Sequence, residues 1–246
     1  MKLAAISDIH SNSAALEAAL SDIERRGINQ IVNLGDSLSG PFDARRTADR
    51  LLSLDLITVR GNHDRQLIDR PVKGMGVWEH WAIFDLTDAH IDWLKALPLT
   101  TTIRDVFLCH ATPERDDENW LDRRGKGDQM IQRDMAAVEE RAKGIDHPVI
   151  LCGHTHTPRI VRLSDGRMIV NPGSVGCPAY VDTRKTPHFI HQTGAPDARY
   201  AILENVMGRW QADLISVPYD ANDMVDLARA KGAENWDQAI TKGWFK

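Results

Sequence analysis

Five short segments of the chain carry side chains that commonly bind metal ions. They are Asp8-Ile9-His10, Gly35-Asp36, Gly61-Asn62-His63-Asp64, the single His110, and Gly153-His154-Thr155-His156. Carboxylate, imidazole and amide groups without thiolate suit divalent first-row transition metal ions such as Mn, Fe, Co, Ni or Zn. Six or seven such donors exceed the three or four protein ligands of a single zinc site, which indicates two ions. A lone carboxylate such as Asp36 can bridge them.

Each of these segments alone is a weak signal. Asp-x-His after a strand is usually a cap, Gly-Asp is commonly a turn, and a single histidine is more often buried than a ligand. The two histidines of Gly-His-Thr-His are more specific, because residues two apart on an extended chain point to the same side. Their joint occurrence predicts a metal site. Its ligands are expected to be Asp8, His10, Asp36, Asn62, His110, His154 and His156.

Every ligand-bearing segment follows a predicted β-strand. The strands are expected at residues 3–7, 30–34, 56–60, 106–109 and 149–152. In open α/β sheets, ligand sites lie beyond the carboxyl ends of the strands. The strand ends therefore point to one location. Gly35, Gly61 and Gly153 come just before the donors, where the backbone must turn sharply and neighbours approach closely.

The first 60 residues alternate between predicted strands and helices. Ser11-Asn12-Ser13 is a good capping cluster for a helix that carries Leu16, Leu20 and Ile23 on one face. A second helix is expected to open at Pro41. This alternation indicates a parallel sheet with helices packed on its faces.

The rest of the chain is less regular. Thr87 is expected to cap a helix that ends before Pro98. Residues 113–128 are polar and predict an exposed loop, which leads into a helix at 128–143 and could cover an active site. Strands are expected at 100–104, 159–163, 168–170, 200–204 and 210–216, and a helical stretch at 221–241. With no repeat or linker, residues 1–246 are interpreted as one domain.

Composition and charge exclude several other classes of protein. The 246 residues have a net charge of −5 without a basic block, so neither specific nucleic-acid binding nor a membrane surface is expected. Cys109, Cys152 and Cys177 form no Cys-x-x-Cys pair, which argues against disulfides and a cysteine zinc site. The chain has neither a signal-peptide core nor an apolar run near 20 residues. A cytoplasmic protein is predicted.

The ligand segments together resemble the full motif set of the calcineurin-like metallophosphoesterase superfamily, in particular its small prokaryotic phosphodiesterase-like group. Asn171-Pro172-Gly173-Ser174 and Val217-Pro218-Tyr219-Asp220 are also similar to that group. The resemblance spans nearly the whole chain. It implies a single domain with an α/β (α+β) fold, a four-layer α/β/β/α sandwich of two mixed β-sheets flanked by helices.

The resemblance also implies how the donors divide between two ions. One ion would take Asp8, His10, Asp36 and His156, and the other Asp36, Asn62, His110 and His154. His63 would face the substrate without binding metal, and Asp64 would orient its ring.

Paired ions can hold a bridging hydroxide for in-line attack on phosphorus. His63 would then act as the acid that protonates the leaving group. The expected substrate is a small phosphodiester, such as a nucleotide derivative, while a phosphomonoester or a protein phosphate stays open.

Two departures from the motifs of other superfamily members bear on the alternative functions. Protein phosphatases and dinucleoside polyphosphate hydrolases usually show an Arg soon after the second motif and Gly-Asn-His-Glu at the third. Here Ser37 follows Asp36, and Asp64 ends the third motif, which counts against both. A non-catalytic interaction scaffold is disfavoured because every ligand position is filled.

Several further residues are given a second interpretation. Arg60 could reach a phosphate oxygen, although a strand-end arginine is more often an ion-pair partner. Aromatic residues could stack on a nucleobase, although packing onto the core is the preferred reading. These are Trp78, Trp81 and Trp120. Cys109 and Cys152 are interpreted as inert core thiols. The histidines outside the motifs, which are not expected to be ligands, are His80, His90, His147, His188 and His191.

Overall fold

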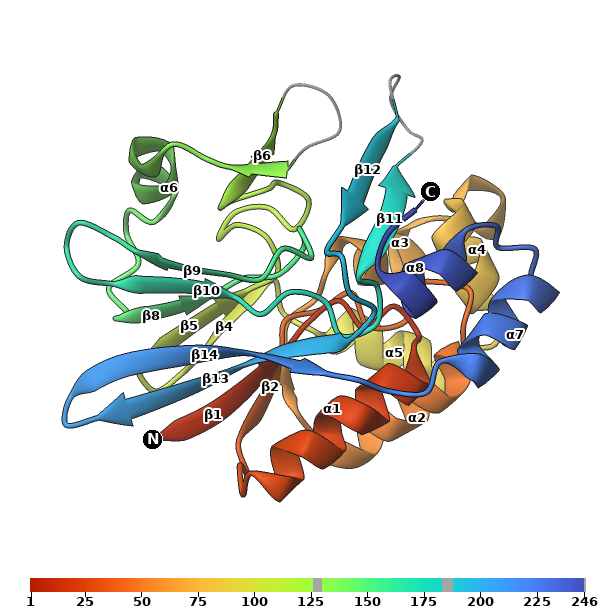
Figure 1. Ribbon diagram of the computed structural model, residues 1–246, viewed down its shortest axis with the longest axis horizontal. Coiled ribbons are helices and arrows are strands. Elements are labelled where there is room, and N and C mark those ends of the chain that lie inside the picture. Colours follow the sequence, from red (N-terminus) through yellow and green to blue (C-terminus); the bar gives the residue numbers. More distant parts are fainter. Residues whose placement is uncertain (126–129, 183–187, 246) are drawn as a thin grey trace.

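Two five-stranded mixed sheets form the centre of the computed structural model, which describes residues 1–125, 130–182 and 188–245 (Figure 1). The first sheet has the order β14-β13-β1-β2-β3. Its strands are β1 (Lys2–Ile6), β2 (Ile31–Asn33), β3 (Ile57–Thr58), β13 (Ala198–Val206) and β14 (Arg209–Val217). The second has the order β4-β5-β8-β10-β9. Its strands are β4 (Thr100–Ile103), β5 (Val106–Cys109), β8 (Val149–Leu151), β9 (Arg159–Arg162) and β10 (Met168–Asn171).

The two sheets pack face to face through alternate residues of their strands. In β1, Leu3 and Ala5 belong to the cluster between the sheets, whereas Ala4 and Ile6 belong to the cluster under the helices. In β8, Val149 and Leu151 likewise lie between the sheets. Because side chains of a strand alternate between its faces, strands buried on both faces read as continuous apolar runs. This is why the runs were recognisable in the sequence.

Helices cover the outer faces of both sheets and complete the four-layer α/β/β/α sandwich predicted from the resemblance (Figure 1). The helices near the first sheet are α1 (Ser13–Arg25), α2 (Ala44–Leu54), α3 (Asn62–Asp69), α4 (Val77–Ile83) and α5 (Asp88–Ala96). The second sheet is covered by α6 (Met135–Arg141). The side chain of Asn12 caps α1, as expected. The second helix begins at Ala44 rather than Pro41, because the side chain of Asp43 accepts from the backbone N–H of Arg46.

The prediction for residues 113–143 is partly wrong. An antiparallel hairpin of β6 (Asp122–Arg124) and β7 (Met130–Gln132) replaces the end of the expected loop and the start of the expected helix; residues 126–129 lie outside the described residues. Trp120 is buried, and its Nε1 donates to the backbone carbonyl of Val138 at 3.0 Å. The polar composition of the segment concealed this apolar anchor beneath α6.

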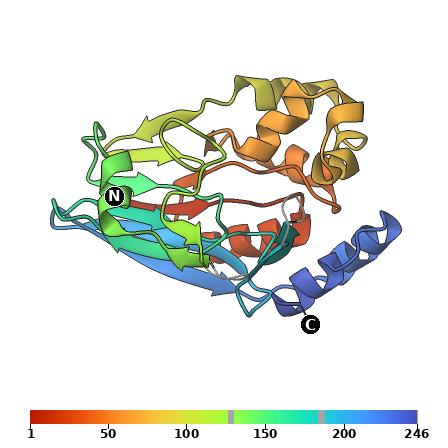
Figure 2. The same ribbon diagram turned by 90° about the horizontal axis from the view of Figure 1, so that it is seen from above.

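The C-terminal part contains two features that the sequence did not reveal. The expected helix at 221–241 is divided into α7 (Asn222–Ala230) and α8 (Trp236–Lys242), with Gly232 at a positive φ of 66° between them. A further hairpin is formed by β11 (Ala179–Asp182) and β12 (Phe189–Gln192). Figures 1 and 2 show α3, α4, α7 and α8 at the end of the molecule away from the N-terminus. No helix in the described part of the chain is long and apolar enough to cross a membrane.

The hydroxyl of Tyr200 on β13 donates to Oδ2 of Asp22 on α1 at 2.7 Å. Tyr200→Phe should lower the free energy of unfolding by about 1 kcal/mol, the usual net value of a buried hydrogen bond. Burial acts to raise the pKa of Asp22, but hydrogen bonds from Tyr200 and Arg26 outweigh it and lower the pKa. The stabilisation should therefore be present near neutral pH and be lost as pH falls through the lowered pKa of Asp22. Urea unfolding of both proteins at pH 7 and pH 3 tests this; equal stability at pH 7 would contradict it.

Candidate metal centre and active site

Two groups of metal-binding side chains lie at the carboxyl ends of the strands, within residues 1–125, 130–182 and 188–245. The first group is Asp8, His10 and His156, and the second is Asp36, His110 and His154. In each group, one potential ligand atom of every residue lies within 4.8 Å of those of the other two. The loops after β1, β2, β5 and β8 supply them. Because β1 runs parallel to β2, and β5 to β8, the loops of each pair meet at the carboxyl edge of their own sheet, as the strand-end argument predicts. The face-to-face packing of the two sheets brings these two edges together.

In the first group, two nitrogens and one oxygen converge. Nε2 of His10 and Nε2 of His156 are 3.1 Å apart. Oδ1 of Asp8 lies 3.3 Å from Nε2 of His156 and 4.0 Å from Nε2 of His10. This oxygen is buried and has no hydrogen-bond partner among the described residues, while Oδ2 accepts from Oγ of Ser7 at 2.6 Å. A buried carboxylate oxygen without a partner is costly, and a cation among these three atoms would satisfy it.

The second ring nitrogen of two of the histidines is held by the backbone. Nδ1 of His110 donates to the carbonyl of Leu34 at 2.7 Å, and Nδ1 of His156 donates to the carbonyl of Cys177 at 2.8 Å. A carbonyl oxygen can only accept, so Nδ1 carries the proton in both rings. When these rings are neutral, Nε2 carries a lone pair. In each ring this lone pair is directed at the other donor atoms of the group, as metal coordination requires.

The buried carboxylates favour positive charge at this edge. Burial acts to lower the pKa of His110, but Asp36, whose Oδ2 is 3.2 Å from its Nε2, outweighs it and raises the pKa to about 10. Burial and the neighbouring His110 lower the pKa of His154 to about 4. Burial would raise the pKa of Asp36, yet the charges of His110, His63 and His10 hold it well below its usual range. Histidines of both groups thus act on Asp36.

Asn62 lies beside the second group, at the start of α3. Its side-chain oxygen faces only acceptors, among them Nδ1 of His154 at 2.8 Å. An amide turned over would instead donate a hydrogen bond to His154. The oxygen-inward orientation is the one that a shared cation would stabilise. Together with Oδ1 of Asp8, this arrangement fits a site for metal ions.

The loops that carry the donors have an uncommon backbone conformation. All but one of the residues in the two groups have φ between 47° and 67°. They are Asp8, His10, Asp36, His154 and His156. Each such residue costs on the order of 1–3 kcal/mol, and strain of this kind clusters at functional sites. Backbone hydrogen bonds hold the loops together, from the N–H of Asp8 to the carbonyl of Gly35 at 3.0 Å and from that of Gly153 to His110 at 2.6 Å.

Glycines allow these loops to come close, as predicted. A Cβ on Gly61 would lie 2.2 Å from Oδ1 of Asp36. A Cβ on Gly153 would lie 2.0 Å from Oγ of Ser7 and 2.7 Å from Oδ2 of Asp8. Any larger residue at either position would displace a donor carboxylate.

The segment 171–174 supports the donor loops from behind. Oγ of Ser174 donates to the carbonyl of Asp8 at 2.6 Å, and Nδ2 of Asn171 donates to the carbonyl of Gly153 at 2.7 Å. These two hydrogen bonds explain why the segment 171–174 occurs together with the ligand motifs.

The predicted role of Asp64 in orienting the ring of His63 is wrong. Both carboxylate oxygens of Asp64 accept backbone N–H groups, from Asp36 at 2.8 Å, Ser37 at 2.9 Å and Gly61 at 3.0 Å. At the third position of α3, its side chain reaches back to the helix N-terminus rather than sideways to the next residue. Burial and the charge of Asp36 raise its pKa to about 6. Asp64 therefore joins two donor loops.

The ring of His63 is instead held by α4, which no sequence pattern revealed. Nδ1 of His63 is hydrogen-bonded to Oε1 of Glu79, a buried residue. The indole of Trp78 stacks on the same ring, with centroids 5.0 Å apart and planes at 15°. Trp78 also meets the ring of His10 edge-on at 5.0 Å. Trp78 packs against a core cluster, as the preferred interpretation has it, and its two ring contacts place it in the candidate site as well. Glu79 was missed because it belongs to no motif.

A hollow of about 200 Å³ opens over the two donor groups. Its lining includes Asp36, Asn62, His63, His154 and His156. Arg70, at the end of α3, also lines it. Arg60 is not among its described lining residues; its backbone N–H donates to the carbonyl of Pro98 at 2.8 Å. The predicted phosphate contact of Arg60 is therefore not supported, and Arg70, which no motif marks, is the arginine that the fold brings here.

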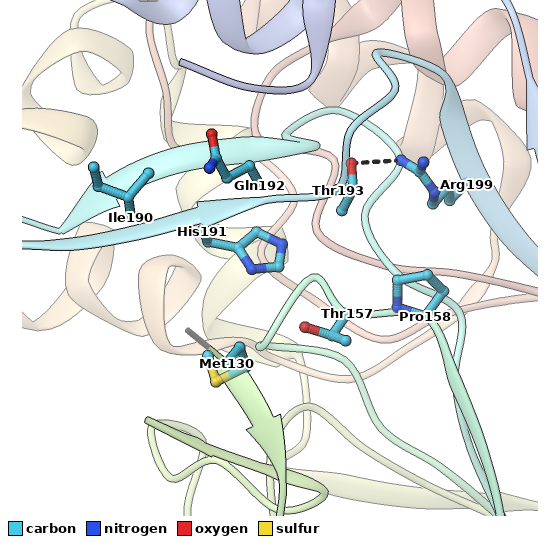
Figure 3. Close-up of a pocket in the computed structure, with 8 residues that line it drawn as sticks. All are labelled: Met130, Thr157, Pro158, Ile190, His191, Gln192, Thr193 and Arg199. Atoms are coloured by element: carbon cyan, nitrogen blue, oxygen red, sulfur yellow. Dashed lines mark hydrogen bonds between the residues drawn. The ribbon is translucent and has the colours of Figure 1, made fainter. Parts of the chain in front are cut away.

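A larger hollow of about 460 Å³ lies beside the first donor group (Figure 3), and the ring centroid of its lining residue His191 is 6.0 Å from that of His156. The ring of His191 points into it near Thr157, and Nη1 of Arg199 donates to Oγ1 of Thr193 at its edge, at 3.0 Å. Among the described residues, none of the predicted ligands lines it. By volume alone, this hollow would be the first candidate for a binding site. Predicted metal ligands, however, line the smaller hollow.

The cysteines and the other histidines lie outside both groups, as far as the structure describes them. Cys109 and Cys152 are buried, and burial raises the pKa of both thiols. They are core residues, as predicted. The histidines outside the groups are His63, His80, His90, His147, His188 and His191.

A two-sheet sandwich with paired carboxylate–histidine groups at one edge defines the architecture of a metallophosphoesterase. Residues 1–193 match the calcineurin-like phosphoesterase superfamily domain, and the chain belongs to that superfamily. The resemblance of the sequence to this superfamily is thereby confirmed.

Known relatives cover nearly the whole chain. A metallophosphoesterase from Sphaerobacter thermophilus is 26% identical, with a TM-score of 0.77 and 99% of each chain covered. Protein PH1004 from Pyrococcus horikoshii shares the fold, with a TM-score of 0.76 and 16% identity, covering 100% of this chain and 99% of its own. Protein MJ0912 from Methanocaldococcus jannaschii is 29% identical over 241 residues, which is 89% of this chain and 88% of that protein. All three are prokaryotic.

Proposed function

We propose that the protein is a metal-dependent phosphoesterase that hydrolyses small phosphodiesters, with nucleotide-like compounds as the preferred class. The observation that carries the proposal is the position of His63, which lies outside both donor groups but lines the hollow above them. A protein that only stored metal would need no such residue. A side chain that can give a proton next to two metal sites is the arrangement for phosphoryl ester hydrolysis.

The proposed ligands follow the two groups. Asp8, His10 and His156 would hold one divalent first-row ion, and His110, His154 and Asn62 the other. Asp36 would serve both, since histidines of both groups act on its charge. When bound, such a pair of ions supplies an activated water and neutralises charge on the phosphate oxygens. Mn, Fe, Co, Ni and Zn all suit these donors.

The proposed role of His63 is to protonate the leaving oxygen of the ester. Glu79 binds Nδ1 of the ring, and Nε2 is the nitrogen that would give the proton. Stacking on Trp78 fixes the plane of the ring. An acid whose ring is already oriented loses little entropy when the substrate binds, which general acid catalysis requires.

The size of the hollow and one arginine in its lining support a small substrate. At about 200 Å³, it accommodates a phosphoryl group and little more, and Arg70 offers a positive charge to a phosphate oxygen. A folded protein surface would reach the donors poorly. A phosphomonoester is the second candidate, because the same hollow fits its single ester group.

The test compares bis(p-nitrophenyl) phosphate with p-nitrophenyl phosphate, using protein stripped of metal and then supplied with Mn²⁺. We expect manganese-dependent hydrolysis with the diester preferred in kcat/KM. Preference for the monoester would move the assignment to a phosphatase. If two ions bind and neither ester nor a panel of nucleotide diesters is cleaved with any first-row metal, the enzymatic proposal is wrong and a non-catalytic scaffold is the better account.

A further inference from the structure

A second hollow, of about 300 Å³, adjoins the hollow over the donor groups. The two hollows share four lining residues, which are Val77, Trp78, Tyr180 and Val181. The larger hollow of Figure 3 shares no described lining residue with either of them. A molecule whose phosphate lies over the donors can therefore extend into the second hollow, past Trp78, more readily than into the hollow of Figure 3.

The walls of this second hollow carry five large aromatic side chains. They include Trp78, Trp81, Tyr180, Trp236 and Phe245. The rings pack edge to face, with centroids 4.7 Å apart for Trp78 and Trp236 and 6.2 Å for Trp81 and Trp236. This aromatic hollow thus combines packed aromatic rings with a few polar side chains at its wall.

Its rings are held in place before any ligand binds. Nε1 of Trp81 donates to the carbonyl of Lys231 at 3.1 Å. Nζ of Lys231 in turn donates to the carbonyl of Trp81 at 3.0 Å and binds Oδ2 of Asp85 at 2.6 Å. Because these side chains are already ordered, a planar ligand would lose little free energy to their immobilisation.

The volumes of the two adjoining hollows indicate which part of a substrate each could hold. Binding sites for small molecules usually measure about 300–1,000 Å³, and the hollow over the donors, at about 200 Å³, lies below that range. It encloses the phosphoryl group, so the remainder of the substrate needs the adjoining space. Glu234 and Asn235 also line the aromatic hollow. Both side chains can form hydrogen bonds with the polar edge of a ring. The negative charge of the Glu234 carboxylate would repel a second phosphate.

We propose that the aromatic hollow binds a planar aromatic group of the substrate, such as a nucleobase, while the phosphate lies over the donor groups. This inference rests on the proposed phosphoesterase function. His63 stacks on Trp78, one of the four residues that line both hollows, so the group in the aromatic hollow would be the one attached to the leaving oxygen. Nucleotide diesters combine both features.

The test measures binding rather than turnover. Adenosine 5′-monophosphate and ribose 5-phosphate carry the same phosphate and differ by the base alone. Each is titrated into the manganese-loaded protein and followed by calorimetry and by tryptophan fluorescence. We expect the adenosine compound to bind at least about ten-fold more tightly, since stacking of one base on aromatic side chains contributes on this order. Equal affinities would overturn the proposal.

Variants locate the effect. Phe245→Ala and Trp81→Leu should each lose most of the difference between the two ligands and leave the affinity for ribose 5-phosphate unchanged. Phe84→Ala is the control, because this exposed aromatic follows the same helix as Trp81 but does not line the hollow. If Trp81→Leu fails to fold, Phe245→Ala still decides, since Phe245 lies outside the helices and strands. A difference that persists in the folded variants would contradict the proposal.

The two proposals can fail separately. Hydrolysis of bis(p-nitrophenyl) phosphate without any preference for the base would keep the phosphoesterase and reject the aromatic subsite. Base-dependent binding without hydrolysis of any diester would keep the subsite and reject the phosphoesterase.

Discussion

Asp36→Ala is expected to lower the metal content of the protein from about two ions to fewer than one and to abolish phosphodiester hydrolysis. Oδ2 of Asp36 belongs to the second donor group and lies 3.2 Å from Nε2 of His110. The carboxylate of Asp36 also interacts electrostatically with His10 of the first group. Removing it takes away a carboxylate from both proposed sites. Activity should fall by more than the roughly 10²–10⁴-fold that loss of a general acid causes. Elemental analysis after dialysis and initial rates with Mn²⁺ measure the two effects.

Controls separate loss of metal from loss of fold. Oδ1 of Asp36 also accepts from the backbone N–H of His63 at 2.8 Å, so alanine removes a structural contact as well. Asp36→Asn retains the shape of the side chain while removing its charge. Asp213→Ala, an exposed aspartate on β14, should change neither metal content nor activity. Two tightly bound ions in a folded Asp36→Asn protein would show that this residue does not serve both sites.

His63→Ala is expected to keep both ions and to lose about 10²–10⁴-fold in kcat, the usual contribution of a general acid. The residue lies outside both donor groups, so its removal leaves every proposed ligand in place. The loss should be smaller for esters whose leaving group needs no proton, such as p-nitrophenolate, than for esters with an alkyl alcohol. Rates with both kinds of leaving group, together with metal content, test the assignment.

A substitution of Glu79 tests the role of His63 in a second way. Glu79→Gln removes the carboxylate that binds Nδ1 of His63 and should give part of the same loss, with the same dependence on the leaving group. His80→Ala, a neighbouring histidine on α4 outside both groups, is the matched control and should behave as wild type. Loss of metal from His63→Ala would refute its assignment as a residue that acts on the substrate alone.

The donor residues could be recognised from the sequence for a simple physical reason. Parallel strands bring their carboxyl ends to one edge, so local strand predictions are enough to place Asp8 beside Asp36, and His110 beside His154. The two pairs belong to different sheets, and only the packing of the sheets brings them together. The short apolar runs before them have the signature of strands buried on both faces. Glycines at 35, 61 and 153 added a local signal for close approach. The recognition of each donor segment needs no knowledge of how distant elements pack.

The partner of His63 could not be recognised in this way. The sequence places Asp64 next to it, but neighbouring residues on a helix point in different directions, about 100° apart for 3.6 residues per turn. Asp64 turns to the backbone of the donor loops, and Glu79 reaches His63 from another helix. The same holds for Arg60 and Arg70, of which only the second lies at the hollow. Which side chain completes a pair depends on helix packing, and no spacing rule encodes it.

The sequence by itself thus determined which side chains could bind metal, their places after strands, and membership of the superfamily. Only the tertiary structure decided the surroundings of those donors. Trp78 and Tyr180, more than 100 positions apart in the chain, meet edge-on with ring centroids 5.9 Å apart, and Trp236 closes the same wall. Strand-end motifs are local because the backbone itself positions them. The walls of the hollows come from helices and a hairpin whose contacts depend on side-chain packing across the whole molecule.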